Sequence, residues 1–271
     1  MTTNNSLAVQ RVRHTLKLRH LQVRRVQQLS PHLVRITFTG DDLADFVSAS
    51  FDDHIKVFFP APGEVAPRMP ELGPNGPTFV EGAARPIARD YTPRRFDPAS
   101  GELDIEFVLH GEGPATTWAA QAKPGQQLGI GGPRGSFVIP TGFHWHLLIG
   151  DDSALPAIAR RLEELPAEAN ALVVLEVADE TAQIPLHSAA HLTVQWLHRD
   201  PADTAGLNLT EAVRQLSLPV GEGYVWAAGE LAAIQSVRKH LVGERGIDKS
   251  RIRAASYWKR GAIASHENLD D

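Results

Sequence analysis

The sequence changes its pattern near residue 140, and this change limits the fold more than any other feature. Before it, short alternating or β-rich runs are separated by turn residues, with one short helix at 114–121. These predicted strands are residues 18–26, 33–39, 55–59, 88–93, 103–109 and 127–130. After it, strands alternate with helices, which is typical of a parallel sheet covered by helices. The predicted strands there are 144–149, 171–177, 192–197, 224–228 and 252–258, and the helices are 154–165, 209–216 and 231–242.

This pattern predicts two domains. We expect an antiparallel β-barrel over residues 16–140, followed by an open α/β domain of the nucleotide-binding type over residues 141–271. Six prolines between residues 60 and 77 exclude a regular helix or a central strand, so a long loop is expected there. Residues 1–15 and 262–271 are expected to be flexible tails.

The chain contains no cysteine. This excludes thiolate zinc sites, cysteine-ligated iron–sulfur clusters, a cysteine nucleophile and disulfides, so any redox chemistry must use a bound cofactor. The hydrolase motifs GxSxG and HExxH are also absent. No metal site is expected, because His144 and His146 have no third ligand at a suitable spacing.

The charge balance adds little, since 27 basic and 32 acidic residues leave a net charge of −5. The basic residues before Asp41, among them Arg24 and Arg25, alternate with apolar residues and fit the outer face of a strand. We therefore expect no nucleic-acid partner. No run approaches the ~20 apolar residues of a membrane span, and the N-terminus lacks an apolar signal core. The sequence thus predicts a cytoplasmic protein with no stable membrane insertion.

The first motif of chemical interest is RDYT, which begins at Arg89. On a strand, Arg89 and Tyr91 share one face. A guanidinium can donate to a phosphate, an aromatic ring can cover a flavin or its ribityl chain, and Thr92 can reach the polar edge of a flavin. The alternative is an outward-facing strand with a surface ion pair, and the motif alone leaves both interpretations open.

The second motif, HGEGPATTWA, follows directly after a predicted strand. Its glycines allow a tight turn, and Pro114 fits the first turn of a helix whose amides and hydroxyls would receive a pyrophosphate. The residues predicted to bind a cofactor here are His110, Gly113, Ala115, Thr116 and Thr117. The alternative is a ligand-free turn with threonine caps. A third stretch, GIGGPRGSF at 129–137, fails the GxGxxG pattern because Arg134 holds the sixth position, so we interpret it as a strand corner where backbone or Ser136 approaches a flavin.

Together these motifs resemble the siderophore-interacting protein family, FAD-containing ferric-siderophore reductases related to the ferredoxin–NADP reductases. The matching pieces occur in the family's order between residues 53 and 261: DHIKVFFP, RDYTPRRFD, ELDIEFVLHGEGPATTWA, GPRGSF, LIGDDSALPAI, WAAGE and SYWKRG. The resemblance implies that residues 16–140 hold non-covalent FAD. Arg89, Tyr91 and Thr92 would bind the flavin and its phosphates, and the turn at 113–117 would surround the pyrophosphate.

For the second domain, the resemblance implies the nicotinamide-nucleotide side. Asp151 and the turn at 227–230 follow predicted strands, at the carboxyl ends where open α/β sheets bind ligands. Two ordinary strand-to-helix turns are the alternative. In SYWKRG, Trp258 would stack near the flavin or its adenine, and Lys259 and Arg260 would attract an anionic ferric siderophore. A solvated basic tail is the alternative there.

By this resemblance, the chain reduces Fe(III) in a ferric siderophore and releases Fe(II). Electrons from NADH, NADPH or a ferredoxin would pass through FAD, so no catalytic acid or base is expected. Two other functions stay open: a general NAD(P)H–flavin or ferredoxin-type reductase with a different acceptor, and a non-catalytic ferric-siderophore binding protein.

Overall fold

The computed structural model describes residues 7–74, 76–79, 82, 85–109, 113–203, 206–261 and 267–269. The chain divides into two compact units, each of which is described by itself. The β unit comprises Val9–Ile139, and the α/β unit comprises Leu7, Ala8 and the chain from Pro140 onward. Among the described residues, no helix has the length and apolar character that crossing a membrane requires.

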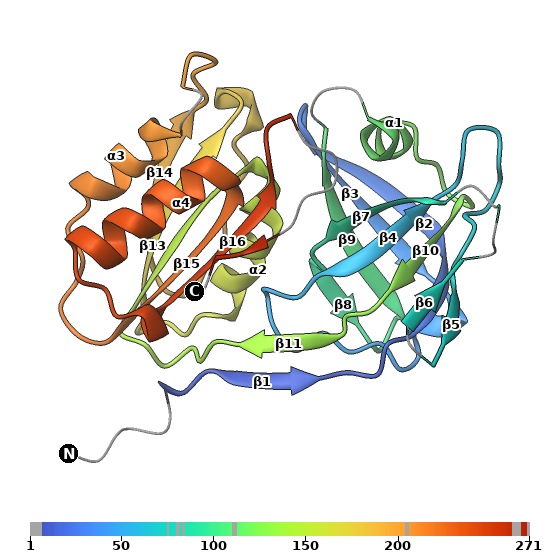
Figure 1. The fold of residues 1–271 in the computed structure, drawn as a ribbon, viewed down its shortest axis with the longest axis horizontal. Coiled ribbons are helices and arrows are strands. Elements are labelled where there is room, and N and C mark those ends of the chain that lie inside the picture. Colours follow the sequence, from blue (N-terminus) through green and yellow to red (C-terminus); the bar gives the residue numbers. More distant parts are fainter. Residues whose placement is uncertain are drawn as a thin grey trace. The chain divides into compact units, whose positions relative to one another are not determined.

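The β unit is built on one antiparallel sheet (Figure 1). Its strand order is β7 (Ile87–Tyr91), β4 (Ile55–Phe59), β10 (Gln127–Gly131), β2 (Leu18–Ser30), β3 (Leu33–Thr39), β9 (Glu102–Val108) and β8 (Arg95–Asp97). Within the described residues the pairing does not continue from β8 back to β7, so the sheet is a half-barrel with β7 at one edge. The predicted antiparallel class is confirmed, in an open form.

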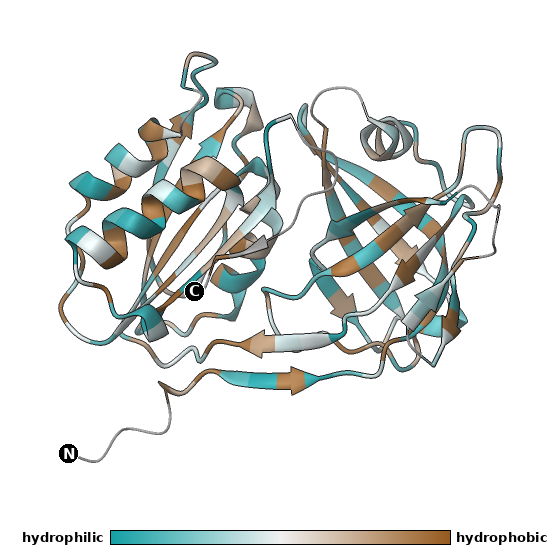
Figure 2. Cartoon of the chain, viewed as in Figure 1, coloured by the Kyte–Doolittle hydropathy of each residue, from teal (hydrophilic) through white to brown (hydrophobic). Residues whose placement is uncertain are grey.

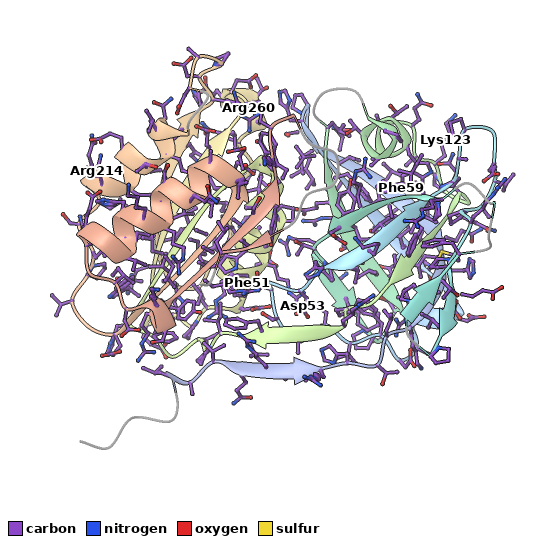
Figure 3. The ribbon with its side chains drawn as sticks, viewed as in Figure 1. Phe51, Asp53, Phe59, Lys123, Arg214 and Arg260 are labelled. Atoms are coloured by element: carbon purple, nitrogen blue, oxygen red, sulfur yellow. The ribbon has the colours of Figure 1, made fainter. Side chains whose placement is uncertain are left out.

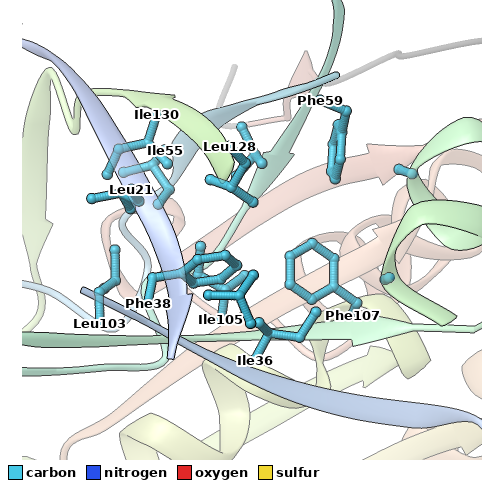
Figure 4. Packing of buried hydrophobic residues seen from close by; sticks show 14 of the residues in the cluster. Leu21, Ile36, Phe38, Ile55, Phe59, Leu103, Ile105, Phe107, Leu128 and Ile130 are labelled. Atoms are coloured by element: carbon cyan, nitrogen blue, oxygen red, sulfur yellow. The ribbon is translucent and has the colours of Figure 1, made fainter. Parts of the chain in front are cut away.

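The core of the β unit comes from the inward faces of these strands. Ile36 and Phe38 on β3 lie opposite Ile105 and Leu103 on β9, and all four side chains are fully buried (Figure 4). Each such side chain stabilises the fold by about 1.5–3 kcal/mol through removal of apolar surface from water. The helix α1 (Pro114–Ala120) adds Ala115 and Ala119 to the same cluster.

Basic residues of β2 and β3 form ion pairs with carboxylates of β9. The Arg25 guanidinium makes two hydrogen bonds to the Glu102 carboxylate, at 3.0 and 2.8 Å, and Arg24 lies 2.9 Å from the same group. Arg35 pairs with the buried Glu106. Cross-strand pairing of this kind explains why so many basic residues alternate with apolar ones before Asp41.

Two segments of the β unit differ from the prediction. Residues 10–13 were expected in a flexible tail, but they form β1 (Gln10–Arg13), which pairs with β11 (Gly135–Val138). All four β1 residues are exposed, so no apolar alternation marked this strand in the sequence. Inside the proline-rich loop, β5 (Glu71–Gly73) and β6 (Gly76–Thr78) form a short antiparallel pair.

The α/β unit contains the second sheet. Its strand order is β14 (His191–His198), β13 (Asn170–Val177), β12 (Trp145–Asp151), β15 (Gly223–Glu230), β16 (Ile252–Trp258) and β17 (Glu267–Asn268). The pairings from β14 to β16 are parallel, and β17 is antiparallel. This confirms the predicted open α/β class. The chain order reverses between β12 and β15, and open sheets bind ligands beyond the carboxyl ends of strands at such a point.

Helices cover this sheet. The helices α3 (Leu207–Gln215) and α4 (Leu231–Lys239) lie side by side and pack on the face that presents Leu147 and Ile149, whereas α2 (Leu155–Glu164) packs against β12 (Figure 1). In Figure 2 both α3 and α4 carry hydrophobic and hydrophilic residues, as expected for helices with one buried face. A π-helical turn, His240–Glu244, extends α4. Single 3-10 turns occupy Asp41–Leu43, Asp152–Ala154, Glu180–Ala182 and Lys249–Arg251.

The start of α3 shows a cap that the sequence analysis missed. The helix was predicted at 209–216, but it starts at Leu207. The Asp203 carboxylate accepts hydrogen bonds from the amides of Leu207 and Asn208, at 2.9 and 2.7 Å. Gly206 links the two with a left-handed backbone (φ +67°), and a Cβ there would lie 2.3 Å from the Cβ of Ala233. Only glycine fits this position without strain.

Candidate functional site

The edge strand β7 places Arg89 and Tyr91 on the face that packs toward the core of the β unit. Asp90 points to the other face and pairs with Lys56 at 2.7 Å. The surface ion pair considered for this strand therefore exists, but it does not include Arg89. The Arg89 Nη1 donates to the Ala88 carbonyl at 2.7 Å, and within the described residues the guanidinium makes no ion pair. It keeps donors for a phosphate.

Tyr91 belongs to a cluster of rings. Its ring centroid lies 4.5 Å from that of Phe107 and 6.2 Å from that of Phe59, which Figure 3 labels. Burial raises the pKa of the Tyr91 hydroxyl further above its usual range, although the nearby Arg89 opposes this shift. The phenol therefore stays protonated near neutral pH and can donate a hydrogen bond. Thr92, the next residue, is buried.

The helix α1 packs against β7 in the same unit. Trp118 joins it to the ring cluster, with ring centroids 5.5 Å from Phe59 and 6.1 Å from Phe107. Pro114 opens the helix after an extended Gly113, and no side chain among the described residues caps this end. The two predicted phosphate-binding features thus meet in one unit. His110 lies outside the described residues.

Not every predicted donor of this turn is available. The Thr117 amide donates to the Gly113 carbonyl at 2.8 Å, so the expectation that it points at a ligand was wrong. Ala115 is buried, and Thr117 is exposed at its side chain. The first turn of a helix leaves its leading amides without partners inside the helix, so the amides of Gly113 and Ala115 are the candidate donors at this end.

The glycine-rich corner at 129–137 serves packing. The Met69 sulfur lies 2.0 Å from where a Cβ of Gly129 would stand, so this glycine admits the proline-rich loop onto β10. Ser136 is buried, its hydroxyl donates to the Asp53 carboxylate at 2.8 Å, and its oxygen lies 2.8 Å from His14 Nε2. These bonds fix β1 and β11 to the chain around Asp53, so the hydroxyl is used inside the protein and not held for a flavin.

In the α/β unit, Asp151 lies at the carboxyl end of β12, as the sequence predicted. Its Oδ1 accepts from the amide and hydroxyl of Ser153. Its Oδ2 accepts from the Glu230 amide at 2.9 Å and from the Trp258 indole Nε1 at 2.8 Å. Since a carboxylate offers about four acceptor positions, the structure uses Asp151 fully within the protein.

Trp258, Lys259 and Arg260 follow one another at the end of β16. The Trp258 ring is half-buried, and both basic side chains are exposed. The Arg260 amide donates to Glu230 Oε1 at 3.2 Å, and Glu230 Oε2 caps α4 through the amides of Ala232 and Ala233. Glu230 was placed from the sequence in the turn at 227–230 of the nucleotide side, but it was not predicted that this carboxylate caps α4. The signal that could have found it is an acidic residue directly before a helix.

Two family models match this chain. Residues 22–137 match the siderophore-interacting FAD-binding domain, and residues 143–261 match the siderophore-interacting protein model. The NADPH-dependent ferric-chelate reductase of Escherichia coli is 37% identical over 258 residues, which cover 92% of this chain and 96% of that protein. The chain belongs to the siderophore-interacting protein family.

Other proteins with siderophore-related names are similar to this chain over most of its length. The ferric vibriobactin reductase ViuB of Vibrio cholerae is 38% identical over 240 residues, which cover 88% of each protein. The crystal structure of a siderophore utilization protein from T. fusca superposes with a TM-score of 0.86 and 37% identity, covering 95% of this chain and 98% of that one. The expected family is confirmed.

The site residues divide between the two matched regions. Arg89, Tyr91, Thr92 and the turn at 113–117 lie inside the FAD-binding match, and Asp151 and residues 258–260 lie inside the second match. The β unit suits a dinucleotide flavin on its own geometry. Among the described residues, it offers a guanidinium without an ion pair and a strand edge that pairs with no other strand, beside the start of a helix.

Proposed function

We propose that this protein is an FAD-dependent reductase of ferric siderophores that takes its electrons from NADH or NADPH. The observation that carries the proposal is the Arg89 guanidinium, which has no carboxylate partner in the described residues and stands on the open edge of β7 beside α1. This arrangement lies in the region that matches an FAD-binding domain. The names of the E. coli and V. cholerae relatives support the ferric substrate.

The side chains of the β unit bind and orient the cofactor. Arg89 binds the pyrophosphate through its fork of donors, together with the leading amides of α1. Tyr91 stays protonated, because burial raises its pKa, and donates a hydrogen bond while its ring remains fixed by Phe107. Thr92 and the edge of β7, which pairs with no other strand of the described residues, bind polar atoms of the flavin. FAD, when bound, supplies the chemistry that couples a two-electron hydride donor to a one-electron acceptor. No side chain of this cysteine-free chain supplies this chemistry.

The ferric chelate is the substrate. Lys259 and Arg260 are exposed and attract an anionic chelate, and the Trp258 ring offers an apolar face. Electron transfer to the metal moves no proton on the protein, so no acid–base pair is needed. Iron leaves because siderophores bind Fe(II) far less tightly than Fe(III). We place the reaction in the cytoplasm, where nicotinamide nucleotides are available, and a ferredoxin is the alternative donor.

The test is a spectrum followed by two additions. Purified protein should show the visible absorption bands of a flavin, or gain them with added FAD. The bands should bleach anaerobically with NADH or NADPH, and a ferric siderophore should then restore them while ferrozine traps Fe(II). Protein that takes up no FAD refutes the reductase. Protein that bleaches but leaves every ferric siderophore unreduced is a general flavin reductase instead. Protein that bleaches only with reduced ferredoxin takes its electrons from a ferredoxin and not from NADH or NADPH.

The site is tested by Arg89→Ala, with Arg95→Ala as the matched control. Arg95 is another strand arginine of the β unit, but it pairs with Asp97 and Asp104. Hydrogen bonds to charged groups contribute about 1.5–3 kcal/mol, so Arg89→Ala should raise the Kd for FAD by about 10- to 100-fold. The control should leave it unchanged. Equal FAD affinity in both variants would remove Arg89 from the site.

A further inference from the structure

Two carboxylates hold the end of β16 against the carboxyl ends of β12 and β15. Asp151 accepts from the Trp258 indole at 2.8 Å, and Glu230 accepts from the Arg260 amide at 3.2 Å. We call these two residues the carboxylate clamp. Ser256 adds a local bond, since its hydroxyl donates to the Trp258 carbonyl at 3.1 Å. The bonds come from three different strands, so the segment 258–260 depends on long-range contacts for its position.

The clamp occupies the point where the chain order of the sheet reverses. Asp151 is only 4% exposed, and its two oxygens each receive two donors. Gly229 makes this possible: its φ is +154°, and a Cβ there would lie 2.7 Å from Asp151 Oδ2. The amides of Ser153 and Glu230, which face the switch point, are thus taken by a protein carboxylate. Asp151 cannot also bind a nucleotide through these oxygens.

The clamped segment keeps its functional groups free. The Trp258 indole N–H is fixed, but the ring is only half-buried. The backbone of Arg260 is fixed, but its side chain is exposed, and within the described residues neither Lys259 nor Arg260 makes an ion pair (Figure 3 labels Arg260). A rigid backbone that carries one aromatic face and two unpaired cations is what a site for an anionic substrate requires.

We propose that Asp151 and Glu230 are positioning residues, which act by holding Trp258, Lys259 and Arg260 in place for the ferric chelate. This inference rests on the proposed function and replaces the prediction that Asp151 contacts a cofactor. Asp151 acts through Trp258, and Glu230 acts through the backbone of Arg260. Loss of the clamp therefore lowers the reaction with the ferric chelate and leaves FAD binding by the β unit unchanged.

The test uses Asp151→Asn in the full chain. An asparagine is uncharged and offers one oxygen and one NH₂ group, so the Trp258 indole faces either an NH₂ or a neutral oxygen and loses its charged acceptor in both orientations. Asp179→Asn is the matched control, because Asp179 makes the same turn with the amide and hydroxyl of Thr181 but follows β13, three positions from β16 in the sheet.

The first readout is structural and needs no activity. In ¹⁵N-labelled protein, the Trp258 indole resonance is identified by its absence in Trp258→Phe. Asp151→Asn should shift this resonance and speed its hydrogen exchange by about 10-fold or more, as expected for loss of a hydrogen bond to a charged acceptor. Asp179→Asn should change neither. An unmoved resonance in Asp151→Asn would overturn the proposal.

The second readout is a double-mutant cycle with an anionic ferric tris-catecholate as substrate. Asp151→Asn should lower kcat/KM by about 10- to 100-fold at an unchanged Kd for FAD, since a displacement of about 1 Å in an active site can cost about 100-fold. In the Trp258→Phe background the same substitution should have little further effect, because Asp151 acts through the indole. Equal effects in both backgrounds would show a merely structural role.

A second variant covers poor folding of Asp151→Asn. Glu230→Gln can still cap α4 or accept from Arg260, but not both, so it should also lower kcat/KM at an unchanged Kd for FAD. An unchanged kcat/KM would remove Glu230 from the clamp. If wild-type protein binds no FAD or reduces no ferric chelate, the proposed function fails, whereas the indole resonance still reports on the Asp151–Trp258 bond.

Discussion

Phe107 connects the two cofactor-binding features of the β unit. Its side chain is fully buried, and its ring lies 4.5 Å from that of Tyr91 on β7 and 6.1 Å from that of Trp118 on α1. Phe38 and Phe59 complete the cluster at 6.5 and 6.3 Å. We predict that Phe107→Leu loosens both features at once, although neither Arg89 nor α1 is altered directly.

The size of the effect follows from these contacts. Exchange of one large apolar side chain for another of similar volume destabilises by up to about 1.5 kcal/mol, and an aromatic pair contributes about 0.5–1.5 kcal/mol beyond its buried area. Phe107→Leu should therefore lower the free energy of unfolding by about 2–3 kcal/mol. The change is measured by urea unfolding of the FAD-free protein. Under conditions where the variant remains folded, fluorescence titration should show a Kd for FAD raised about 10-fold, which corresponds to about 1.4 kcal/mol.

Leu103→Ala separates this effect from a general loss of stability. Leu103 lies on the same face of β9 and is also fully buried, and its removal should cost about 2–5 kcal/mol. Because Leu103 has no ring to support Tyr91 or Trp118, the Kd of the Leu103→Ala variant for FAD should equal that of the wild type. If Leu103→Ala weakens FAD binding as much as Phe107→Leu does, or if Phe107→Leu binds FAD normally, the reasoning about the ring cluster is wrong.

Two further predictions concern the loop and the pH dependence. Gly129→Ala places a Cβ where the Met69 thioether lies, so cleavage of residues 61–79 in limited proteolysis should become faster. Adding Met69→Ala should restore slow cleavage in the double variant. Equal cleavage rates in the wild type and in Gly129→Ala would contradict this packing. Burial beside Arg161 lowers the pKa of His146 to about 4, below its unfolded value of about 6.5. The unfolded state therefore binds more protons between these values, so stability is fully present above about pH 6.5 and falls by about 3 kcal/mol as the pH drops to 4. In His146→Gln this loss should shrink in acid urea titrations, and an identical pH profile would assign the loss to other groups.

The fold class was predictable because its signals are local. The strand–helix alternation after residue 140 reflects which side chains face the sheet, and each helix or strand carries that signal within its own length. The same is true of the β3 and β9 alternation in the β unit, whose inward residues are the fully buried Ile36 and Ile105. Such patterns need no knowledge of the partner strand.

The features that the sequence did not predict depend on partners far along the chain. Nothing in residues 10–13 indicates that they pair with β11, more than 120 residues later. All four residues are exposed, and Val12 is the one apolar residue among them. The role of Asp151 is similar. Its place at the end of β12 was predictable, but its donors Glu230 and Trp258 lie 79 and 107 residues away. Sequence spacing cannot show that these donors consume the carboxylate before any ligand reaches it.

The glycines show why a motif is a weak guide until its neighbours are known. Gly150 and Gly229 lie at the carboxyl ends of β12 and β15, where glycine commonly admits a phosphate to the backbone. Here a Cβ at Gly150 would lie 2.5 Å from the Cβ of Ala154, and a Cβ at Gly229 would meet the Asp151 carboxylate. The space that both glycines leave is filled by the protein's own side chains. Because the Asp151 carboxylate fills the space at Gly229, we expect a ligand of the α/β unit to be bound by side chains that remain exposed, such as Lys259 and Arg260 at the end of β16.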